Sequence, residues 1–548
     1  MKLDISRLID EGFQSCAEFA KQAESFKFLH EFQVKQTNKT EPDKLIYGDN
    51  LLASIILGTQ EQKYQLIYID PPYASNSSYS LKLRVGEANE KIKIPVYSDV
   101  WRNGLQSYLS MLLPRLYFMR NLLTDSGSIF VHVDTKASHY VKILMDEIFG
   151  AENFVNEIIY RKDAGQRVTS YFPRKHDVIL FYAKDLNKLK FNMHAPLLRT
   201  DYNDTAVKMH FKPDKKHRLV RKYPSGKKFY KDLGKLIDDI WDDISTQQAS
   251  SPIMSETTGF ETQKPTALLE RIISAVTDNE ETYREKLALH EFLQHKRQSG
   301  SKFGQANSRK QDVILHNWTN EFFLDAKNFW LEKVKDELVP QADTIADFFA
   351  GSGTTGITAH QLKRDFVLCE IDRTAWAVTL KRLLSNQTQD LQCLRTHDCS
   401  EKHESEIKDV LDSQQVHFLK PSAQLDSLHQ KRKNKPKIYY APVNAKIIEK
   451  DKKTLLKIEI PQSAKRKISR SNPDSKSKQS PRYEFDFCII QQGKSKKPLT
   501  ASEAYPLNKV GKNEYEILTD ETSNKLQNST ICIFDIFGNV FIADGETC

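Results

Sequence analysis

Cysteine is scarce in this chain, and long apolar runs are missing from it. The seven cysteines, at positions 16, 369, 393, 399, 488, 532 and 548, include no C-x-x-C pair, which argues against a disulfide framework and indicates a reducing compartment. Cys393, His397, Cys399 and His403 lie close together, but their spacing fits no common zinc finger, so we expect no metal. Without a signal peptide or a membrane-spanning run, we expect a soluble, cytoplasmic protein with no membrane partner.

Acidic residues are in deficit relative to basic ones. The chain has 81 Lys and Arg against 72 Asp and Glu, a formal net charge of +9. This balance favours a polyanionic partner, although it does not establish one. With 548 residues, 39% of them hydrophobic, the chain can bury a large core and should hold roughly two to four domains.

A first motif joins a short apolar run to an acid and two prolines. Leu66–Ile69 is typical of a buried strand, and Pro71 and Pro72 must end it because proline cannot donate to a sheet. Asp70 then stands at the strand's carboxyl end, where open α/β sheets bind ligands. The Asp70 carboxylate and the Pro71 carbonyl, beside the Tyr73 ring, suit a planar base with an exocyclic amino group. The alternative is a strand-end turn with a structural tyrosine.

A second motif, far downstream, contains a glycine-rich turn. It runs Asp347-Phe348-Phe349-Ala350-Gly351-Ser352-Gly353-Thr354-Thr355-Gly356, between an expected strand end and an expected helix. Gly351 and Gly353 allow a tight turn and the close approach of a ligand to the backbone. The strand expected at Phe366–Cys369 ends in Glu370, placed to bind a ribose hydroxyl pair. The loop carries no G-K-[ST] for a triphosphate, so we expect a nucleoside ligand.

Together these motifs resemble the S-adenosylmethionine-dependent amino-methyltransferases of DNA. The order, D-P-P-Y first and F-x-G-x-G later, is that of the circularly permuted β group of these enzymes. Trp241–Ile244, Ser128–Asp134 and Asp146–Gly150 further resemble the modification subunits of type III restriction systems. The resemblance covers about residues 43–400 and depends on an ordered combination of independent signals.

The resemblance implies S-adenosylmethionine as the cofactor and N6 of a flipped adenine in duplex DNA as the target. It implies catalytic roles for Asp70, Pro71, Pro72 and Tyr73. The cofactor-binding residues that it implies are Asp49, Lys264, Asp347, Phe349, Gly351, Ser352, Gly353, Thr354, Thr355 and Glu370, with Asp49 near the adenine and Lys264 near the methionine end.

Several alternatives to this function stay open. Cytosine N4 is a second possible target, although family members that modify cytosine usually carry serine where Asp70 stands. A catalytically inactive DNA-binding module on the same fold and an RNA methyltransferase are further alternatives. The partners implied are double-stranded DNA, a second copy of the chain in a homodimer, and a separate restriction subunit, because no nuclease motif is evident here.

The expected fold class is α/β, a doubly wound and mostly parallel sheet of the Rossmann-like methyltransferase type. We expect a target-recognition insertion, a helical insertion and a small β-rich C-terminal domain. The expected divisions are an N-terminal helical cap (1–42), a catalytic half (43–190), a target-recognition region (191–250), a cofactor-binding half (251–278 and 339–400), a helical insertion (279–338), and a linker-containing C-terminal domain (401–548).

Three segments carry more specific expectations. Residues 208–231 hold ten Lys or Arg against one acid, with aromatics interleaved, so we favour DNA contact over a solvated loop. The DNA-binding candidates are Lys208, Lys215, Lys216, Arg218, Arg221, Lys222, Lys227 and Lys228. Residues 74–99 are expected to form a long loop that closes over the base, or else to be disordered. An apolar stripe from Phe322 to Leu338 is expected to be core or subunit interface.

Overall fold

The computed structural model describes most of residues 3–398 and a set of strands beyond them. The described ranges are 3–35, 41–72, 78–85, 90–98, 104–162, 170–193, 195–214, 217, 219–223, 228–244, 263–298, 321–386 and 390–398, together with the strands between 444 and 544. Within these ranges, no helix is both long and apolar enough to cross a membrane.

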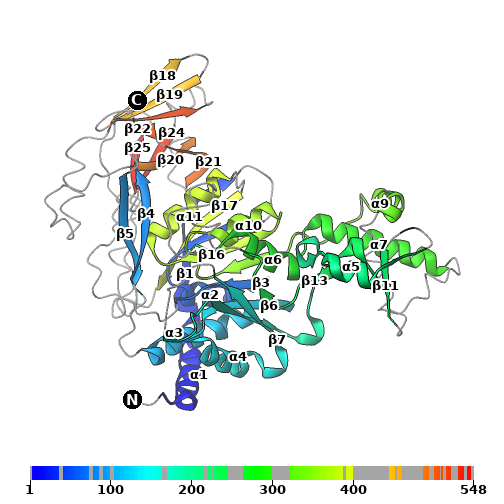
Figure 1. Ribbon diagram of the computed structural model, residues 1–548. Helices are drawn as coiled ribbons and strands as arrows, with labels where there is room; N and C mark the ends of the chain where they lie inside the picture. Colours follow the sequence, from blue (N-terminus) through cyan, green and yellow to red (C-terminus); the bar gives the residue numbers. More distant parts are fainter. Residues whose placement is uncertain are drawn as a thin grey trace.

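One large sheet organises the described residues (Figure 1). Its strand order is β14-β7-β8-β6-β3-β15-β16-β2-β17-β1 and continues into β21-β20-β24-β25. The strands of the first stretch are β14 (Ile240–Trp241), β7 (Phe154–Arg161), β8 (His176–Ala183), β6 (Leu123–Asp134), β3 (Tyr64–Ile69), β15 (Thr344–Asp347), β16 (Asp365–Glu370), β2 (Asp43–Tyr47), β17 (Asp390–Asp398) and β1 (Phe26–Lys35). From β6 to β17 every neighbouring pair is parallel.

Helices cover both faces of this sheet. One core contains residues of α1 (Ile5–Lys21), α2 (Asn50–Thr59), α3 (Leu105–Asn121) and α4 (Ser138–Phe149), and the other contains residues of α6 (Thr266–Val276), α10 (Thr354–Gln361) and α11 (Arg373–Ser385). Along β3, Leu66 and Tyr68 enter the second core while Ile67 and Ile69 enter the first, because successive strand side chains point to opposite faces. The doubly wound, mostly parallel fold expected from the sequence is therefore confirmed.

β8 departs from the parallel arrangement. It pairs antiparallel with both β6 and β7, in a sheet that the sequence predicted to be mostly parallel. Between the end of β7 at Arg161 and the start of β8 at His176, none of the described residues is helical, whereas a parallel return usually uses a helical crossover.

The N-terminal segment also differs from the expected helix. α1 ends at Lys21, a short 3-10 turn η1 (Ala23–Ser25) follows, and Phe26–Lys35 forms β1, which pairs antiparallel with β17. Phe26 and Phe28 are two residues apart, which is the period of a strand. The expectation of an irregular loop or disorder at 74–99 was wrong where the structure describes it, because β4 (Ser78–Val85) and β5 (Glu90–Ser98) pair as an antiparallel ribbon. Closure of this segment over the base stays a prediction.

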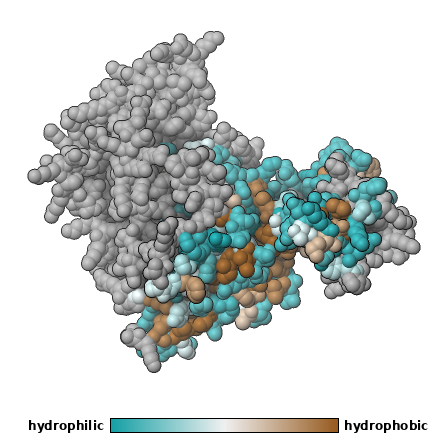
Figure 2. Space-filling view, viewed as in Figure 1, coloured by the Kyte–Doolittle hydropathy of each residue, from teal (hydrophilic) through white to brown (hydrophobic). Residues whose placement is uncertain are grey.

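A lobe projects from one side of the sheet (Figure 1). It contains α5 (Asp204–His210) and the small sheet β10 (Lys212–Pro213), β11 (Leu219–Lys222) and β12 (Lys228–Tyr230), with the pair β9 (Arg199–Thr200) and β13 (Lys235–Leu236) near its base. It also contains the helices α7 (Glu280–Gln298) and α9 (Glu321–Lys333). Figure 2 shows its visible face as largely hydrophilic, with small apolar spots.

Helices α7 and α9 pack on one another through a small separate core. Ala288, Leu289, Phe292, Leu293 and Val334 are buried there, with Ala326 and Trp330 against them. The expected stripe is thus core over part of its length only. Phe329 is 56% and Leu338 is 99% exposed, because two packed helices can cover only one face of each other.

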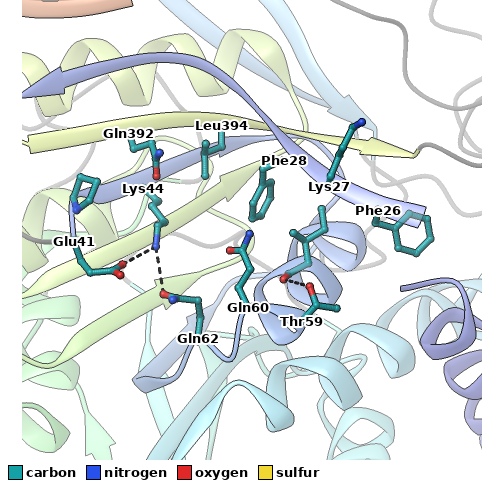
Figure 3. A pocket seen from close by; sticks show the side chains of 12 residues that line it. Phe26, Lys27, Phe28, Glu41, Lys44, Thr59, Gln60, Gln62, Gln392 and Leu394 are labelled. Atoms are coloured by element: carbon teal, nitrogen blue, oxygen red, sulfur yellow. Dashed lines mark hydrogen bonds and ion pairs between the residues drawn. The ribbon is translucent and has the colours of Figure 1, made fainter. Parts of the chain in front are cut away.

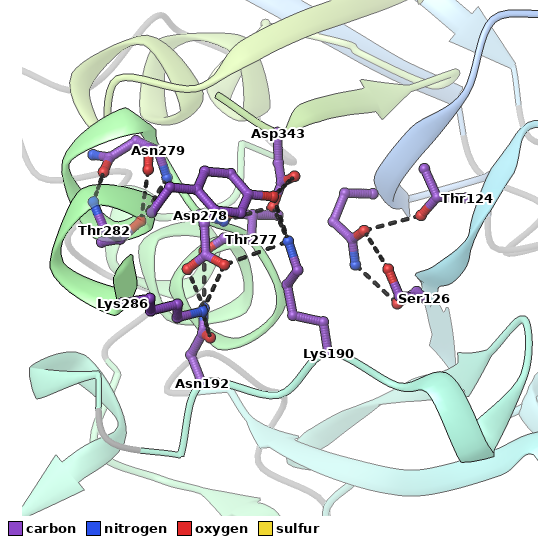
Figure 4. A network of polar contacts seen from close by, with 12 residues as sticks. Thr124, Ser126, Lys190, Asn192, Thr277, Asp278, Asn279, Thr282, Lys286 and Asp343 are labelled. Carbon is purple, nitrogen blue, oxygen red and sulfur yellow. Dashed lines mark hydrogen bonds and ion pairs between the residues drawn. The ribbon is translucent and has the colours of Figure 1, made fainter. Parts of the chain in front are cut away.

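A buried charge network fixes the base of this lobe to the sheet (Figure 4). Asp278, 1% exposed in its side chain, pairs with Lys190 at 3.4 Å and with Lys286 at 2.6 Å. Lys190 also binds Asp343 at 2.7 Å, and Asp343 accepts from Tyr283 at 2.7 Å. Asp343 directly precedes β15, so the network links the start of α7 to the strand that leads into the glycine-rich loop.

The C-terminal part is built of strands, as expected from its strand-like runs. They are β18 (Asn444–Lys450), β19 (Lys453–Glu459), β20 (Phe485–Gln492), β21 (Leu499–Pro506), β22 (Asn508–Lys509), β23 (Glu514–Thr519), β24 (Ser529–Asp535) and β25 (Val540–Asp544). β18, β19, β23 and β22 form a sheet of their own, and β21 pairs with β1. The remaining 3-10 turns are η2 (Ala151–Asn153), η3 (Leu186–Lys188), η4 (Pro196–Leu198) and η5 (Lys231–Leu233). The linker expected within the C-terminal domain, a Lys/Ser-rich segment at residues 463–482, lies outside the described residues.

Candidate active site

The two sequence motifs meet at one edge of the sheet. β3 and β15 are neighbouring parallel strands, with Ala346 opposite Ile67, so Asp70 and the start of the glycine-rich loop leave the sheet side by side. β16 lies on the other side of β15, with Leu368 opposite Asp347, and brings Glu370 to the same edge. The carboxyl ends of parallel strands thus gather residues from positions 70, 347–353 and 370.

Asp70 is ion-paired with Lys264, which comes from just before α6. The side chains are 19% and 13% exposed, respectively, so the pair is mostly shielded from solvent. The sequence analysis placed Lys264 at the cofactor's methionine end, whereas the structure brings its ammonium to Asp70. Pro71 is buried and Pro72 half-buried; Tyr73 lies outside the described residues.

Asp347 is a buried carboxylate that holds the loop in shape. It accepts hydrogen bonds from the Phe349 N–H at 2.9 Å and from the Thr355 hydroxyl at 2.5 Å. Burial raises the pKa of Asp347 to about 7, against the opposing effect of these two hydrogen bonds. The fold therefore keeps an acid with a near-neutral pKa beneath the loop.

Three glycines shape the turn from β15 into α10. Gly351 and Gly353 have φ values of +53° and +77°, which favour glycine. A Cβ on Gly353 would lie 2.4 Å from Thr379, and one on Gly356 would lie 2.5 Å from Leu368. A Cβ on Gly351 would meet nothing nearer than 3.9 Å, so this side of the turn is open to a ligand. Gly356 completes a G-x-G-x-x-G spacing, which the sequence analysis overlooked, and it lets α10 pack closely on β16.

Glu370 ties the end of β16 to the loop. One carboxylate oxygen accepts from the Gly351 N–H at 2.8 Å, and the other accepts from the Asp372 N–H at 2.8 Å. Burial raises the pKa of Glu370 to about 8, partly offset by the hydrogen bond from Asp372. Ser352, Thr354 and Thr355 are all buried, and Arg382 donates to the Ser352 carbonyl at 2.5 Å.

Asp49 supports the site from β2. It caps α2 by accepting from the Leu51 and Leu52 N–H groups, and its second oxygen binds Arg115 at 2.8 Å. Asn50 donates to the Phe348 carbonyl at 2.7 Å and accepts from Arg115 at 2.5 Å. The sequence analysis missed Asn50 and Arg115; the adjacency of Asn50 to Asp49 could have pointed to Asn50, whereas no local signal points to Arg115.

A buried polar chain runs beneath Asp70. Tyr68, two residues earlier on β3, is hydrogen-bonded to His132 Nδ1 at 3.0 Å, and His132 Nε2 lies 3.4 Å from Asp177. Lys162 binds the other oxygen of Asp177 at 2.5 Å. Burial lowers the pKa of His132, with Lys264 adding to the effect, so the imidazole is neutral near pH 7. The sequence analysis did not find this chain, because its members lie on different strands.

The basic stretch forms a compact substructure where it is described. Lys208 lies on α5, and Lys222 of β11 pairs in register with Lys228 of β12. Arg221 stacks 4.6 Å from the Tyr223 ring. Lys215, Lys216, Arg218 and Lys227 lie outside the described residues. The described stretch is thus a helix and a small sheet, rather than an extended loop.

A cavity of about 510 Å³ lies away from these residues (Figure 3). Its lining includes Lys44 at the start of β2 and Gln62 just before β3, which places it at the opposite edge of the parallel strands. Lys44 binds Glu41 and Gln62 across it. It has no connection with the motif residues, so the candidate site is defined by the strand ends and not by this cavity.

Comparison with known proteins gives matches in sequence. A family model described as "DNA methylase" matches residues 64–283 and 331–381. The type II methyltransferase M.EcaI of Enterobacter cloacae is 34% identical over 169 residues, 31% of this chain and 34% of its own. The type III EcoP15I Mod subunit of Escherichia coli is 27% identical over 28% of this chain and 26% of its own.

A longer match joins the chain to a probable type III HindVI Mod subunit of Haemophilus influenzae. It is 21% identical over 66% of this chain and 53% of that protein. The matches therefore span between about a quarter and about half of these three relatives. Among solved structures, that of M1.HpyAVI is 16% identical and covers 62% of this chain and 98% of its own, with a TM-score of 0.30. At that score the likeness does not bear on the fold, which rests on the strand order and its connections.

Proposed function

This chain belongs to the DNA methylase family, and from that premise we propose that it methylates N6 of adenine in duplex DNA, with S-adenosylmethionine as the methyl donor. The observation that carries the proposal is the meeting of Asp70 and the 347–353 loop at the ends of β3 and β15. An acceptor for an amino group and a turn suited to a nucleoside then lie next to each other.

The cofactor site that we propose is the loop and its acidic neighbours. The open side of Gly351, the Phe349 ring and the Glu370 carboxylate would receive the nucleoside, with Asp49 toward its base. The buried acids Asp347 and Glu370 suit a positively charged ligand, because a nearby cation compensates a desolvated carboxylate. When bound, S-adenosylmethionine supplies an electrophilic methyl group on its sulfonium sulfur.

The reaction that we propose uses few protein groups. The adenine N6 lone pair is delocalised into the ring, so the nitrogen is a poor nucleophile. Asp70 and the Pro71 carbonyl would accept hydrogen bonds from N6–H₂ and so favour a pyramidal nitrogen in the transition state. Tyr73 would stack on the base. Correct alignment of the attacking nitrogen would supply much of the acceleration.

Access to the target requires a flipped base. N6 is out of reach for in-line transfer inside a stacked duplex, so the nucleotide must rotate out, at a cost of roughly a few kcal/mol. Lys264 engages Asp70 in this structure, so the amino group of the base must share or displace that contact. We propose that phosphate contacts from the 208–231 substructure help to meet this cost.

The names of the relatives suggest the biological system in which this chain acts. Two of these three relatives are type III Mod subunits, one of them described as probable, so we propose that this chain is the modification component of a restriction-modification system. On this proposal it acts as a homodimer, and a separate subunit cuts DNA. The finer elements, namely adenine as the base and the type III class, rest on Asp70 and on those names.

One experiment tests the chemistry and the target together. DNA from cells expressing the chain is sequenced for modified bases, beside DNA from cells expressing Asp70→Ala. We expect N6-methyladenine at one sequence context in the first sample. In Asp70→Ala we expect the rate of methyl transfer to fall by at least roughly a hundredfold, so that the modified base is lost. Calorimetry should find cofactor binding retained in Asp70→Ala. N4-methylcytosine would identify the alternative target, and near-normal methylation by Asp70→Ala would overturn the mechanism.

A further inference from the structure

Two neighbouring aromatic side chains project into solvent just before β8. Phe172 is 96% exposed and Tyr171 is 61% exposed. A single exposed aromatic residue is unremarkable, but an adjacent pair costs more to leave in water. Pro173, Arg174 and Lys175 follow directly, so two rings and two cations lie within five consecutive residues. Aromatic faces interleaved with cations are typical of surfaces that bind unstacked nucleic-acid bases.

The register of the sheet places this segment at the catalytic edge. Asp177 of β8 lies opposite Asp134 of β6, and Val131 of β6 lies opposite Ile69 of β3. Because β8 is antiparallel to β6, its beginning stands where β3 and β6 end. Two strand spacings, roughly 10 Å, separate β8 from β3. The exposed rings and Asp70 therefore leave the sheet at the same edge.

Next to this segment lies a pocket whose charged lining is mainly basic. A pocket of about 400 Å³ is lined by Arg174 of this segment, by His176 at the start of β8, by Lys136 and His139 near the start of α4, and by Glu157 of β7. Arg174, Lys136 and His139 are exposed. Glu157 is the one acid of the lining, so the cations outnumber it even with both histidines neutral.

We propose that Tyr171 and Phe172 enter the DNA stack at the gap left by the extruded target base, while Arg174 and Lys136 hold flanking phosphates. This inference rests on the proposed function, because it assigns a second contact to the same flipped substrate. A flipped nucleotide leaves its former neighbours unstacked, and an aromatic ring in the gap restores a stacking surface to them. The segment that carries the rings and Asp70 leave the sheet at the same edge, two strands apart, so a duplex bound at this edge could reach both.

The test varies how costly the base is to extrude. Phe172→Ala and Tyr171→Ala are assayed on three duplexes: normally paired, mismatched at the target, and abasic opposite the target. Extrusion costs least when the target is already poorly paired. We expect Phe172→Ala to slow methylation of the paired duplex by at least roughly tenfold, because removal of one stacking ring weakens binding by roughly tenfold or more. On the mismatched and abasic duplexes we expect most of this effect to disappear.

Extrusion itself can be followed without turnover. With 2-aminopurine in the target position, the fluorescence rise that accompanies unstacking should be smaller for Phe172→Ala than for the unsubstituted chain at saturating protein. Arg174→Gln should instead weaken binding to all three duplexes alike and lower the slope of log affinity against log salt by about one unit.

A matched control is available at the opposite edge of the sheet. Phe191 is 42% exposed and lies beyond the end of β8, next to Lys190, whose N–H binds the Ser126 carbonyl. Phe191→Ala should methylate all three duplexes at the normal rate. If Phe172→Ala is as active as this control, or loses activity equally on all three duplexes, the gap-filling role is wrong. If the unsubstituted chain methylates none of them, the proposed function fails instead.

Discussion

Lys264 and Asp70 form an ion pair across 194 residues of sequence. Asp70 ends the strand of the first motif, and Lys264 begins the element that leads into α6. Both side chains are mostly shielded from solvent, where removing one partner of a pair costs far more than it would at the surface. From this contact we propose that Lys264 acts at the target amino group, whereas the resemblance implied a role at the methionine end of the cofactor.

Replacing Lys264 by Met distinguishes these two roles. If the ammonium positions Asp70, kcat should fall, by roughly tenfold to a hundredfold, while the Kd for S-adenosylmethionine stays within about twofold. If it holds the cofactor's methionine end, the Kd should rise and kcat should change little. We expect the first pattern, with partial recovery in Lys264→Arg because the guanidinium keeps the charge. Calorimetry and steady-state kinetics on the same preparations measure both quantities.

Cofactor binding should depend on pH through Asp347 and Glu370. Burial raises the pKa values of these acids to about 7 and about 8, so both are largely protonated at pH 6 in the free protein. A bound sulfonium favours the carboxylates, so binding should release protons and affinity should rise from pH 6 to about pH 8, then level off. Calorimetry in buffers of different ionisation enthalpy counts the protons. In Glu370→Gln the upper part of this rise should be absent.

Asp347 and Glu370 should also make the free energy of unfolding depend on pH, but in the opposite direction to cofactor affinity. A carboxyl whose folded pKa lies above its unfolded value binds its proton more tightly in the folded state. Its contribution is therefore fully present below about pH 4 and is lost as pH rises through the folded pKa values, between about pH 4 and pH 8. Without cofactor, Asp347 and Glu370 should thus lower the free energy of unfolding over that range, and saturating S-adenosylmethionine should restore part of it. Thermal unfolding at pH 5 and pH 8, with and without the cofactor, measures the effect.

The two loop glycines should differ in their sensitivity to substitution. At Gly353 an added Cβ would lie 2.4 Å from the Thr379 methyl carbon, and φ is +77°; both effects destabilise. At Gly351 the Cβ has room, and only the φ of +53° is unfavourable. Gly351→Ala should therefore cost about 1–2 kcal/mol in the free energy of unfolding, and Gly353→Ala distinctly more. Denaturant unfolding of the two variants measures the difference, and equal unfolding energies would contradict the crowding at Thr379.

The larger substitution Gly351→Val tests whether this loop binds the cofactor. Its side chain would fill the open side of the turn and weaken S-adenosylmethionine binding, which calorimetry checks on folded protein. Unchanged affinity in Gly351→Val would remove the cofactor assignment from this loop.

Much of the site follows from local chemistry in the sequence. Asp70 and Glu370 each follow an apolar run, and runs of this kind end at the ligand-binding edge of an α/β sheet. Gly351 and Gly353 lie in a turn that only glycine enters easily. In both cases the signal is contained within about ten residues, so no knowledge of the tertiary fold is needed.

Contacts between distant segments could not be predicted in this way. Lys264 reaches Asp70, Arg115 reaches Asp49, and Tyr68, His132 and Asp177 meet only because β3, β6 and β8 lie side by side. The antiparallel β8 was missed because an apolar run does not reveal its direction. β1 was missed because, over so short a stretch, the spacing of its aromatic residues fits both a helix and a strand.

The basic substructure of residues 208–231 gives the last prediction, which concerns how DNA is held. If it follows phosphates, each contacting lysine or arginine releases about one counterion on binding, and affinity falls steeply with salt. Neutralising Lys215, Lys216, Arg218 and Lys222 together should weaken binding to specific and unrelated duplexes alike. It should also flatten the slope of log affinity against log salt by roughly one unit for each phosphate that is no longer neutralised.

The control for this prediction must remove the same charge elsewhere. Arg7, Lys188, Lys335 and Lys363 are exposed and each pairs with a nearby acid. Neutralising these four changes the net charge equally, so a general weakening of the attraction to DNA would appear in both variants, whereas the removal of specific phosphate binding would appear only in the first. Cofactor affinity should stay constant in both, because neither set includes a residue of the 347–353 loop or its acids. A stronger effect on the specific sequence, by about 1–3 kcal/mol, would mean that one of the first four reads a base edge. Identical slopes for the two variants would mean that the substructure does not track phosphates.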